Sequence, residues 1–154
     1  MRKAKPVNAI ELLKEDHKYV KDAFRVFERM DHEDHQAVHA LVSQVCAALK
    51  AHAKVEEELF YPTVRRKIDD EELIDEAEVE HDSAKTLIRH LERMKPHDPK
   101  YAATFSVLGE YVKHHVKEEE SEIFPKARRR KVNLKALGNK LLARKIELVN
   151  RELR

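Results

Sequence analysis

One short segment of this chain occurs twice, and the repetition restricts the folds that the chain can adopt. Residues 51–62 read AHAKVEEELFYP, and residues 115–125 read HVKEEESEIFP. In each copy a glutamate follows a histidine by four residues, and a proline follows the same histidine by ten. Residues four apart are neighbours on one face of an α-helix, so each copy places a carboxylate beside an imidazole. The two copies therefore predict two equivalent helices in a duplicated structure.

Apolar residues recur at alternating steps of three and four along most of the chain, a spacing that predicts amphipathic helices. Only two glycines and five prolines occur, and strand-like alternation is nearly absent, so a sheet is disfavoured. The apolar residues of the first and third expected helices match at an offset of 64 residues. The expected helices cover residues 8–30, 36–61, 72–94, 99–128 and 134–153.

Two copies of a helical pair with short connections favour an all-α fold, an up-down-up-down antiparallel four-helix bundle with an additional C-terminal helix. A chain of 154 residues fits one domain with a substantial core. We expect residues 8–130 to form the bundle and residues 131–154 to form an amphipathic helix packed on it or beside it. Pro62 either kinks the second helix or ends its regular part.

Polar residues interrupt the apolar stripe of each bundle helix where a core residue is expected. His17 and His81 lie about nine residues from the starts of their helices, and the two His–Glu pairs lie roughly nine to fourteen residues from the ends of theirs. An antiparallel arrangement brings these positions to the same height. The side chains expected in this layer are His17, His52, Glu56, His81, His115 and Glu119.

Six ionisable groups buried in one layer need a partner, because an uncompensated buried charge is costly and two facing carboxylates repel. A cation between them removes both problems. Imidazole and carboxylate ligands suit iron, and also manganese or zinc, whereas the lack of thiolates disfavours copper(I). Four imidazoles and two bridging carboxylates can hold two ions with a bridging oxo or hydroxo group. Open positions would then remain for a small ligand, as in reactive sites.

Each of these residues also has a simpler explanation. A single His–Glu pair at this spacing is usually a hydrogen bond on a helix surface, and a single histidine on an apolar stripe is usually a core residue. The matched pairs favour metal binding instead. His114 competes with His115 as a ligand, because Glu118 follows His114 by four residues. The repeat aligns His52 with His115, which favours His115.

Four further carboxylates flank the expected ligands. Glu57 and Glu120 follow the two glutamates of the repeat, and each is either part of a solvated face or a hydrogen-bond partner of a ligand. Asp16 and Glu80 precede the two single histidines in both halves. For these two residues both explanations remain open.

The combined pattern resembles that of the hemerythrin-like (HHE cation-binding) proteins. The resemblance covers about residues 8–130 and includes the flanking segments EDHKYV, EEELFYP and EEESEIFP. It implies a four-helix bundle with two non-haem Fe ions, a di-iron site that binds oxygen or reacts with its products. The metal ligands that the resemblance implies are His17, His52, Glu56, His81, His115 and Glu119.

The pattern departs from that of the oxygen-carrying hemerythrins at two places. Those carriers have a second histidine on the third helix, four residues from the first, whereas Ala77 and Lys85 stand four residues before and after His81. They also end with an aspartate five residues after its histidine, whereas Glu119 follows His115 by four. An iron ion short of one ligand favours redox turnover over reversible oxygen carriage.

We therefore expect a protein that reacts with dioxygen or peroxide, in catalase- or peroxidase-like detoxification or other redox chemistry. If it is an enzyme, it is a di-iron oxidoreductase. An alternative is a module that binds or senses oxygen, nitric oxide or iron and changes the packing of the C-terminal helix. Oxygen storage is a further alternative. The C-terminal helix also offers a surface for a protein partner or for dimerisation.

Composition limits the other classes of function. A net charge of +2 gives no overall basic bias, so nucleic acid is not an expected partner. No apolar run approaches the roughly 18 residues that span a bilayer, so no membrane is expected as a partner. The lone Cys46 forms no internal disulfide, and no signal peptide is visible, so we expect a cytoplasmic protein.

Overall fold

The computed structural model of the protein describes residues 8–152, with side chains through residue 151, and every regular element in this part of the chain is helical. The all-α fold and the C-terminal helix expected from the sequence are both confirmed. The elements in chain order are α1 (Ala9–Arg29), α2 (His35–Val55), η1 (Glu56–Phe60), α3 (Tyr61–Lys67), α4 (Glu71–Arg93), α5 (Tyr101–Glu118), η2 (Glu119–Ile123), α6 (Phe124–Arg129) and α7 (Leu134–Glu152).

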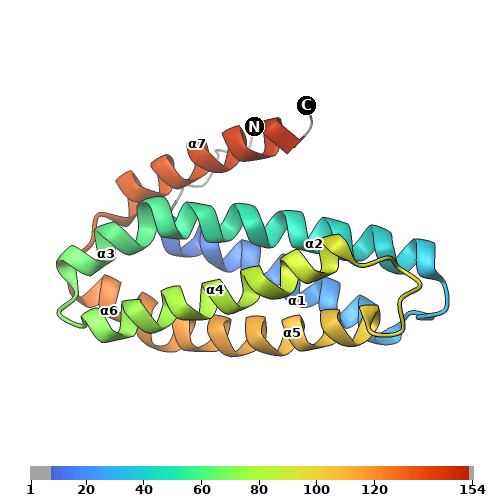
Figure 1. Ribbon diagram of the computed structural model, residues 1–154. Helices are drawn as coiled ribbons and strands as arrows, with labels where there is room; N and C mark the ends of the chain where they lie inside the picture. Colours follow the sequence, from blue (N-terminus) through green and yellow to red (C-terminus); the bar gives the residue numbers. More distant parts are fainter. Residues whose placement is uncertain (1–7, 153–154) are drawn as a thin grey trace.

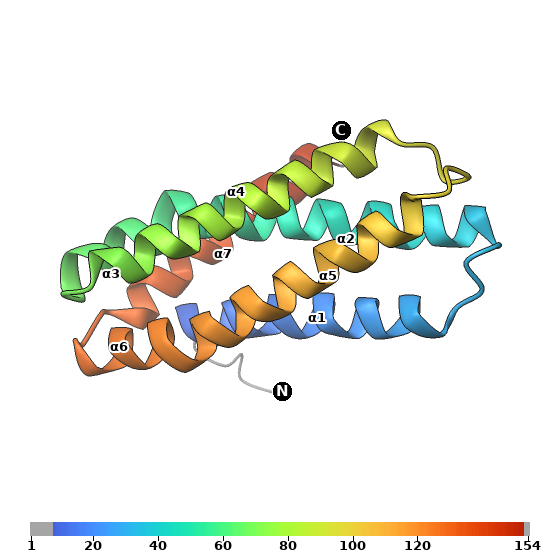
Figure 2. The ribbon, with the colours of Figure 1, turned by 60° about the horizontal axis from the view of Figure 1, so that its bottom comes forward.

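Four long helical rods form a bundle. The first and third rods are α1 and α4, the second joins α2, η1 and α3, and the fourth joins α5, η2 and α6. Figures 1 and 2 show the rods side by side, with successive rods running in opposite directions. Contacts of α1 with α2 and α5, and of α4 with α2 and α5, close the bundle. The up-down-up-down antiparallel four-helix bundle expected from the repeat is therefore confirmed.

Side-chain caps determine where three of the rods begin. Asn8, Asp34 and Asp70 each accept a hydrogen bond from a backbone N–H two or three residues further on, which satisfies a donor that the first helical turn leaves free. The fourth rod begins at Tyr101, two residues later than expected. The reason is that the Asp98 carboxylate accepts a backbone hydrogen bond within the preceding turn instead of capping a helix.

The second and fourth rods each contain a π-helical turn at the same place in the repeat. The turns begin at Glu56 and Glu119, and each glutamate carbonyl accepts a hydrogen bond from the N–H five residues further on. Pro62 and Pro125 stand two residues after the ends of these turns. A proline lacks an N–H and clashes with the carbonyl four residues earlier in an α-helix, so a wider turn resolves the conflict. Pro62 therefore does not end its rod, which continues to Lys67.

Two apolar clusters fill the interior, and the histidine and glutamate layer lies between them. The α7-side cluster includes Phe60 and Phe124, whose rings lie 5.7 Å apart edge to face. The second cluster, here called the loop-side cluster, lies towards the α1–α2 and α4–α5 connections and includes Phe24, Phe27 and Phe105. The rings of Phe24 and Phe27 lie 4.6 and 4.8 Å from that of Phe105. Aromatic pairs at these distances add to the stabilisation from burial alone. The polar layer is thus enclosed by apolar packing on both sides.

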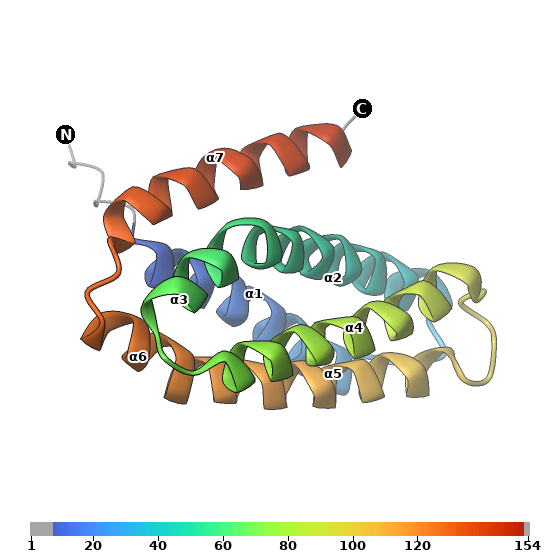
Figure 3. The ribbon, with the colours of Figure 1, turned by 60° about the vertical axis from the view of Figure 1, so that its left-hand side comes forward.

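Helix α7 lies on the outside of the bundle, over α1 and α2 and near η1 (Figures 1 and 3). Asn133 caps its first turn. Leu137, Leu141 and Leu148 pack into the α7-side cluster, and Leu141 is fully buried. Helix α7 is therefore part of the core at this end of the molecule. Within residues 8–152, no helix combines the length and the apolar content that crossing a membrane requires.

Candidate metal centre

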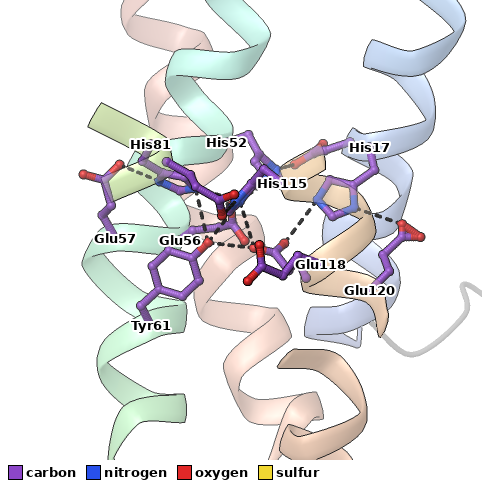
Figure 4. A network of polar contacts seen from close by, with 12 residues as sticks. His17, His52, Glu56, Glu57, Tyr61, His81, His115, Glu118 and Glu120 are labelled. Carbon is purple, nitrogen blue, oxygen red and sulfur yellow. Dashed lines mark hydrogen bonds and ion pairs between the residues drawn. The ribbon is translucent and has the colours of Figure 1, made fainter. Parts of the chain in front are cut away.

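The six side chains singled out from the sequence meet in one layer inside the bundle. Figure 4 shows His17, His52, Glu56, His81 and His115 of this layer. The α1 and α4 rods each supply one histidine, and the other two rods each supply a His–Glu pair. Both glutamates are fully buried, and the side-chain exposure of the histidines is between 4% and 11%. The structure thus brings together all of His17, His52, Glu56, His81, His115 and Glu119.

The ligand-type atoms of these residues form two groups, and the atoms within each group lie within 4.8 Å of one another. The first group contains Glu56, His81, His115 and Glu119, and the second contains His17, His52 and Glu119. Glu119 belongs to both: its Oε1 lies 3.2 Å from His17 Nε2, and its Oε2 lies 3.2 Å from His115 Nε2. Two atoms that bind one ion at about 2.1 Å and at right angles are about 3 Å apart. Glu119 therefore lies within ligand distance of both groups of histidines.

Glu56 lies between the two sets of histidines in a similar way. Its Oε1 is 2.8 Å from His52 Nε2 and 3.2 Å from His81 Nε2. The i, i+4 spacing on the rod accounts for the first contact, and the packing of α4 against the second rod accounts for the other. The two glutamates together connect all four histidines.

Each histidine is held from outside the layer by a carboxylate at its Nδ1 atom. An ionised carboxylate only accepts hydrogen bonds, so Nδ1 carries the proton and Nε2 presents a lone pair to the interior. The pairs are His17 with Glu120 (3.3 Å), His52 with Asp16 (2.9 Å), His81 with Glu57 (3.0 Å) and His115 with Glu80 (3.0 Å). Asp16 and Glu80 are therefore hydrogen-bond partners of a histidine and not part of a solvated face, and Glu57 and Glu120 have the same role.

When each histidine is neutral with its proton on Nδ1, several buried atoms of the layer have no hydrogen-bond partner among the described residues, and they provide a test of whether a metal fits. They are His17 Nε2, His52 Nε2, both carboxylate oxygens of Glu56, and Glu119 Oε1. In addition, His81 Nε2 and His115 Nε2 lie 3.1 Å apart, and with both protons on Nδ1 their lone pairs face each other. Unpaired buried acceptors are costly, by about 1–3 kcal/mol each. Bound cations satisfy all of these atoms at once, so the residues fit a pair of metal ions.

Protons and cations compete for the same atoms. Burial lowers the pKa of His52, but the charge of Glu56 and the hydrogen bond with Asp16 outweigh burial and raise this pKa to about 10. Burial likewise raises the pKa of Glu56, but the neighbouring His52 and hydrogen bonds with the histidines hold it well below its usual range. The pKa of His115 is raised well above its usual value, because hydrogen bonds with Glu119 and other carboxylates outweigh burial. Metal binding must therefore displace protons from the layer.

Tyr61 is part of the centre and was missed in the sequence. Its hydroxyl donates a 2.6 Å hydrogen bond to Glu119 Oε2 and lies 3.2 Å from His81 Nε2 and 3.3 Å from His115 Nε2. Burial and the nearby carboxylates raise the pKa of Tyr61 well above its usual value, so the phenol keeps its proton. The equivalent residue of the other half is Phe124, which stacks on His17 at a ring separation of 5.9 Å. The difference between Tyr61 and Phe124 at equivalent positions of the repeat is the sequence feature that could have identified Tyr61.

His114, the rival candidate, lies outside the layer. Its side chain is 73% exposed, and its Nε2 is 3.4 Å from Glu80 and 3.6 Å from Glu118. Ala77 and Lys85 stand four residues before and after His81, where oxygen-carrying hemerythrins were expected to have a second histidine. Ala77 packs in the α7-side cluster, and Lys85 forms an ion pair with Glu57.

A small cavity of about 50 Å³ adjoins the layer on its loop side. Its apolar wall includes Val20, Ile88, Val112 and Val116, and the layer histidines form its floor. A single water needs at least 10–15 Å³ of such volume, so the cavity has room for a molecule of a few atoms. An organic substrate of ordinary size does not fit there.

The comparisons with known proteins agree with this geometry. The family model described as "Hemerythrin HHE cation binding domain" matches residues 8–127, so the chain belongs to the hemerythrin HHE cation-binding family and is a cation-binding protein. A crystal structure of a hemerythrin HHE cation binding domain-containing protein from Mycobacterium kansasii superimposes with a TM-score of 0.81 at 27% identity, covering 96% of this chain and 90% of the other.

One relative of known sequence is named for an activity on DNA. The chain is 30% identical over 121 residues to a DNA nickase from Nostoc sp. strain PCC 7120. The match covers 77% of this chain but only 33% of the nickase. The chain thus spans about a third of the length of that relative.

Proposed function

We propose that the protein binds two iron ions through the six layer residues and reacts with hydrogen peroxide or dioxygen. The observation that supports this most directly is the set of buried, unbonded ligand atoms beside a small apolar cavity. Manganese and zinc suit the same donor set, but zinc supplies no redox chemistry. When bound, a redox-active metal pair supplies the electron exchange by which two H₂O₂ become O₂ and two H₂O.

The chain's own residues prepare the site for such a reaction. The four outer carboxylates fix the histidine rings with Nε2 pointing inward, so little reorganisation accompanies metal binding. Tyr61 keeps its hydroxyl proton and lies within 3.3 Å of His81 and His115, so it is placed to donate a hydrogen bond to an oxygen atom in the layer. The apolar cavity admits small neutral molecules and disfavours ions and larger reductants.

Metal analysis and peroxide turnover together test the proposal. Purified protein should contain iron, and iron-loaded protein should release oxygen from hydrogen peroxide, measured with an oxygen electrode. His81→Ala should lower both the iron content and the rate. His90→Ala, at an exposed position of the same helix, is the matched control and should change neither. If His81→Ala keeps full iron and full rate, the proposal is wrong.

A second candidate function is a sensing module, and one contact favours it. Lys145 of α7 bonds to Asp16, which orients His52, so the C-terminal helix is connected to the layer. A ligand that alters the centre would then alter the docking of α7. Hydrogen exchange of residues 134–152, with and without iron and nitric oxide, measures this; unchanged protection counts against sensing. Oxygen storage would instead show a reversible absorption band that depends on oxygen.

DNA cleavage is not carried over from the Nostoc relative. The match leaves two thirds of the nickase without a counterpart in this chain, and the activity in its name belongs to the whole protein. The layer and its apolar cavity suit a small molecule instead of a nucleic acid strand.

A further inference from the structure

Helix α7 contacts the metal centre through a chain of three side chains. Lys145 Nζ donates a 2.6 Å hydrogen bond to Asp16 Oδ1, and the other oxygen, Asp16 Oδ2, accepts a 2.9 Å hydrogen bond from His52 Nδ1. Asp16 is only 15% exposed and His52 only 9%. The path from α7 through α1 to α2 therefore runs mostly beneath the surface.

This connection distinguishes one of the four outer carboxylates from the others. Glu57 pairs with Lys85 of α4, Glu120 lies 4.0 Å from Lys21 of α1, and Glu80 lies 3.4 Å from a histidine of α5. All of these partners belong to the segment that the family model matches, which ends at residue 127. Of the four outer carboxylates, only Asp16 is held by a described residue of α7.

The surroundings of the Lys145–Asp16 pair allow it to open without disrupting the core. A groove of about 590 Å³ separates the C-terminal half of α7 from α1 and α2, and both residues of the pair line it. The helix is anchored elsewhere, by the buried Leu141 and by a two-pronged bond from Arg144 to Glu58. Loss of the Lys145 contact therefore need not detach the helix.

We propose that Lys145 is a positioning residue that couples the docking of α7 to the metal affinity of the His17–His52 group. Lys145 holds one oxygen of Asp16, so the carboxylate cannot rotate and its second oxygen stays on His52 Nδ1. That bond keeps His52 Nε2 directed at the layer. Because such coupling is reciprocal, metal bound at this group strengthens the docking of α7. The inference rests on the proposed metal binding by the layer.

The test compares neighbouring residues of α7. Lys145→Met removes the contact with Asp16, whereas the control Arg144→Met removes an ion pair that anchors the same helix but ends on Glu58, which touches no ligand. Ferrous iron affinity is measured anaerobically by competition with a chelator, together with the number of ions bound. Lys145→Met should weaken one ion by about three- to tenfold, less than the 10–100-fold typical of direct ligand partners, and leave the other unchanged.

Two further measurements separate positioning from general destabilisation. Lys145→Arg keeps a cationic donor and should restore the affinity. Iron should slow hydrogen exchange of residues 134–152 in the wild type and in Arg144→Met, but not in Lys145→Met. Equal behaviour of the Lys145→Met and Arg144→Met variants, or equal weakening of both ions, overturns the inference while leaving the proposed function intact. A wild-type protein that binds no iron overturns both.

Discussion

The two halves of the bundle have the same ligand residues but different surroundings. Residues 9–67 and 71–129 each supply two histidines and a glutamate at matching positions. Tyr61 of the first half donates a hydrogen bond to Glu119, whereas its counterpart Phe124 only stacks on a histidine. Helix α7 contacts one outer carboxylate and leaves the other three to the bundle. The two halves thus share the same donor residues, while the residues around them make the two candidate ligand groups chemically unequal.

The largest expected effect concerns the two glutamates, which are equivalent by the repeat but not by the grouping of atoms. Glu119 faces the two groups with separate oxygens, Oε1 towards His17 and Oε2 towards His115, whereas Glu56 approaches both groups with Oε1 alone. Glu119→Ala should abolish retention of both ions, and Glu56→Ala should retain one, as measured by elemental analysis after desalting. Glu122→Ala, exposed in the same π-helical turn, is the control and should keep both. Equal loss in the two glutamate variants would mean that the halves bind metal symmetrically.

Exchange of the aromatic residues gives the next largest effect. Tyr61→Phe leaves Glu119 Oε2 without its donor, which should destabilise the metal-free protein by about 1–3 kcal/mol in urea unfolding. Phe124→Tyr places a hydroxyl, by the repeat, near Glu56, whose oxygens have no hydrogen-bond partner among the described residues. Phe124→Tyr should lower the free energy of unfolding by less than Tyr61→Phe does. A larger cost for Phe124→Tyr would show that the pocket around this ring is not equivalent to that around Tyr61.

A change of pH should have a smaller, graded effect on the stability of the metal-free protein and on its metal affinity. The folded pKa of His52 is about 10 against a usual 6.5, so this proton stabilises the metal-free protein below pH 6.5, and the contribution is lost as pH rises towards 10. Metal must displace the same proton, so metal affinity should rise with pH over this range, by about tenfold per pH unit for each proton released.

Chelator competition at several pH values measures this slope. Asp16→Asn removes one cause of the raised pKa and should reduce the slope, whereas Glu80→Gln acts on His115 in the other group. A slope that neither variant changes would mean that the displaced protons come from elsewhere.

The positions of the six layer residues could be predicted from the sequence because burial makes polar residues conspicuous on an apolar helical stripe. His17 and His81 were identified in this way, and the repeat supported both. The π-helical turns could not be predicted, since Pro62 is compatible with a kink, an end or a widened turn, and tertiary packing decides among them. Tyr61 was missed because an aromatic residue at a helical interior position is normally a core residue.

The outer carboxylates show a different limit. Asp16 and Glu57 belong to a chain in which charged residues make up 39% of the sequence, so their charge alone did not distinguish a solvated face from a bond to a ligand. The orientation of the rods decides which carboxylate meets which histidine, and each outer carboxylate acts on a histidine of a different rod. The contact from Lys145 depends on how α7 docks, which sequence periodicity does not specify.

The polar layer also divides the hydrophobic core, with one apolar cluster on each side of it. Each cluster contains side chains from all four rods, so each end of the molecule can order around its own aromatic residues. Cooperative unfolding units often follow such boundaries. Ions bound in the layer would join all four rods at the boundary, so metal would determine whether the two ends of the bundle melt together or one after the other.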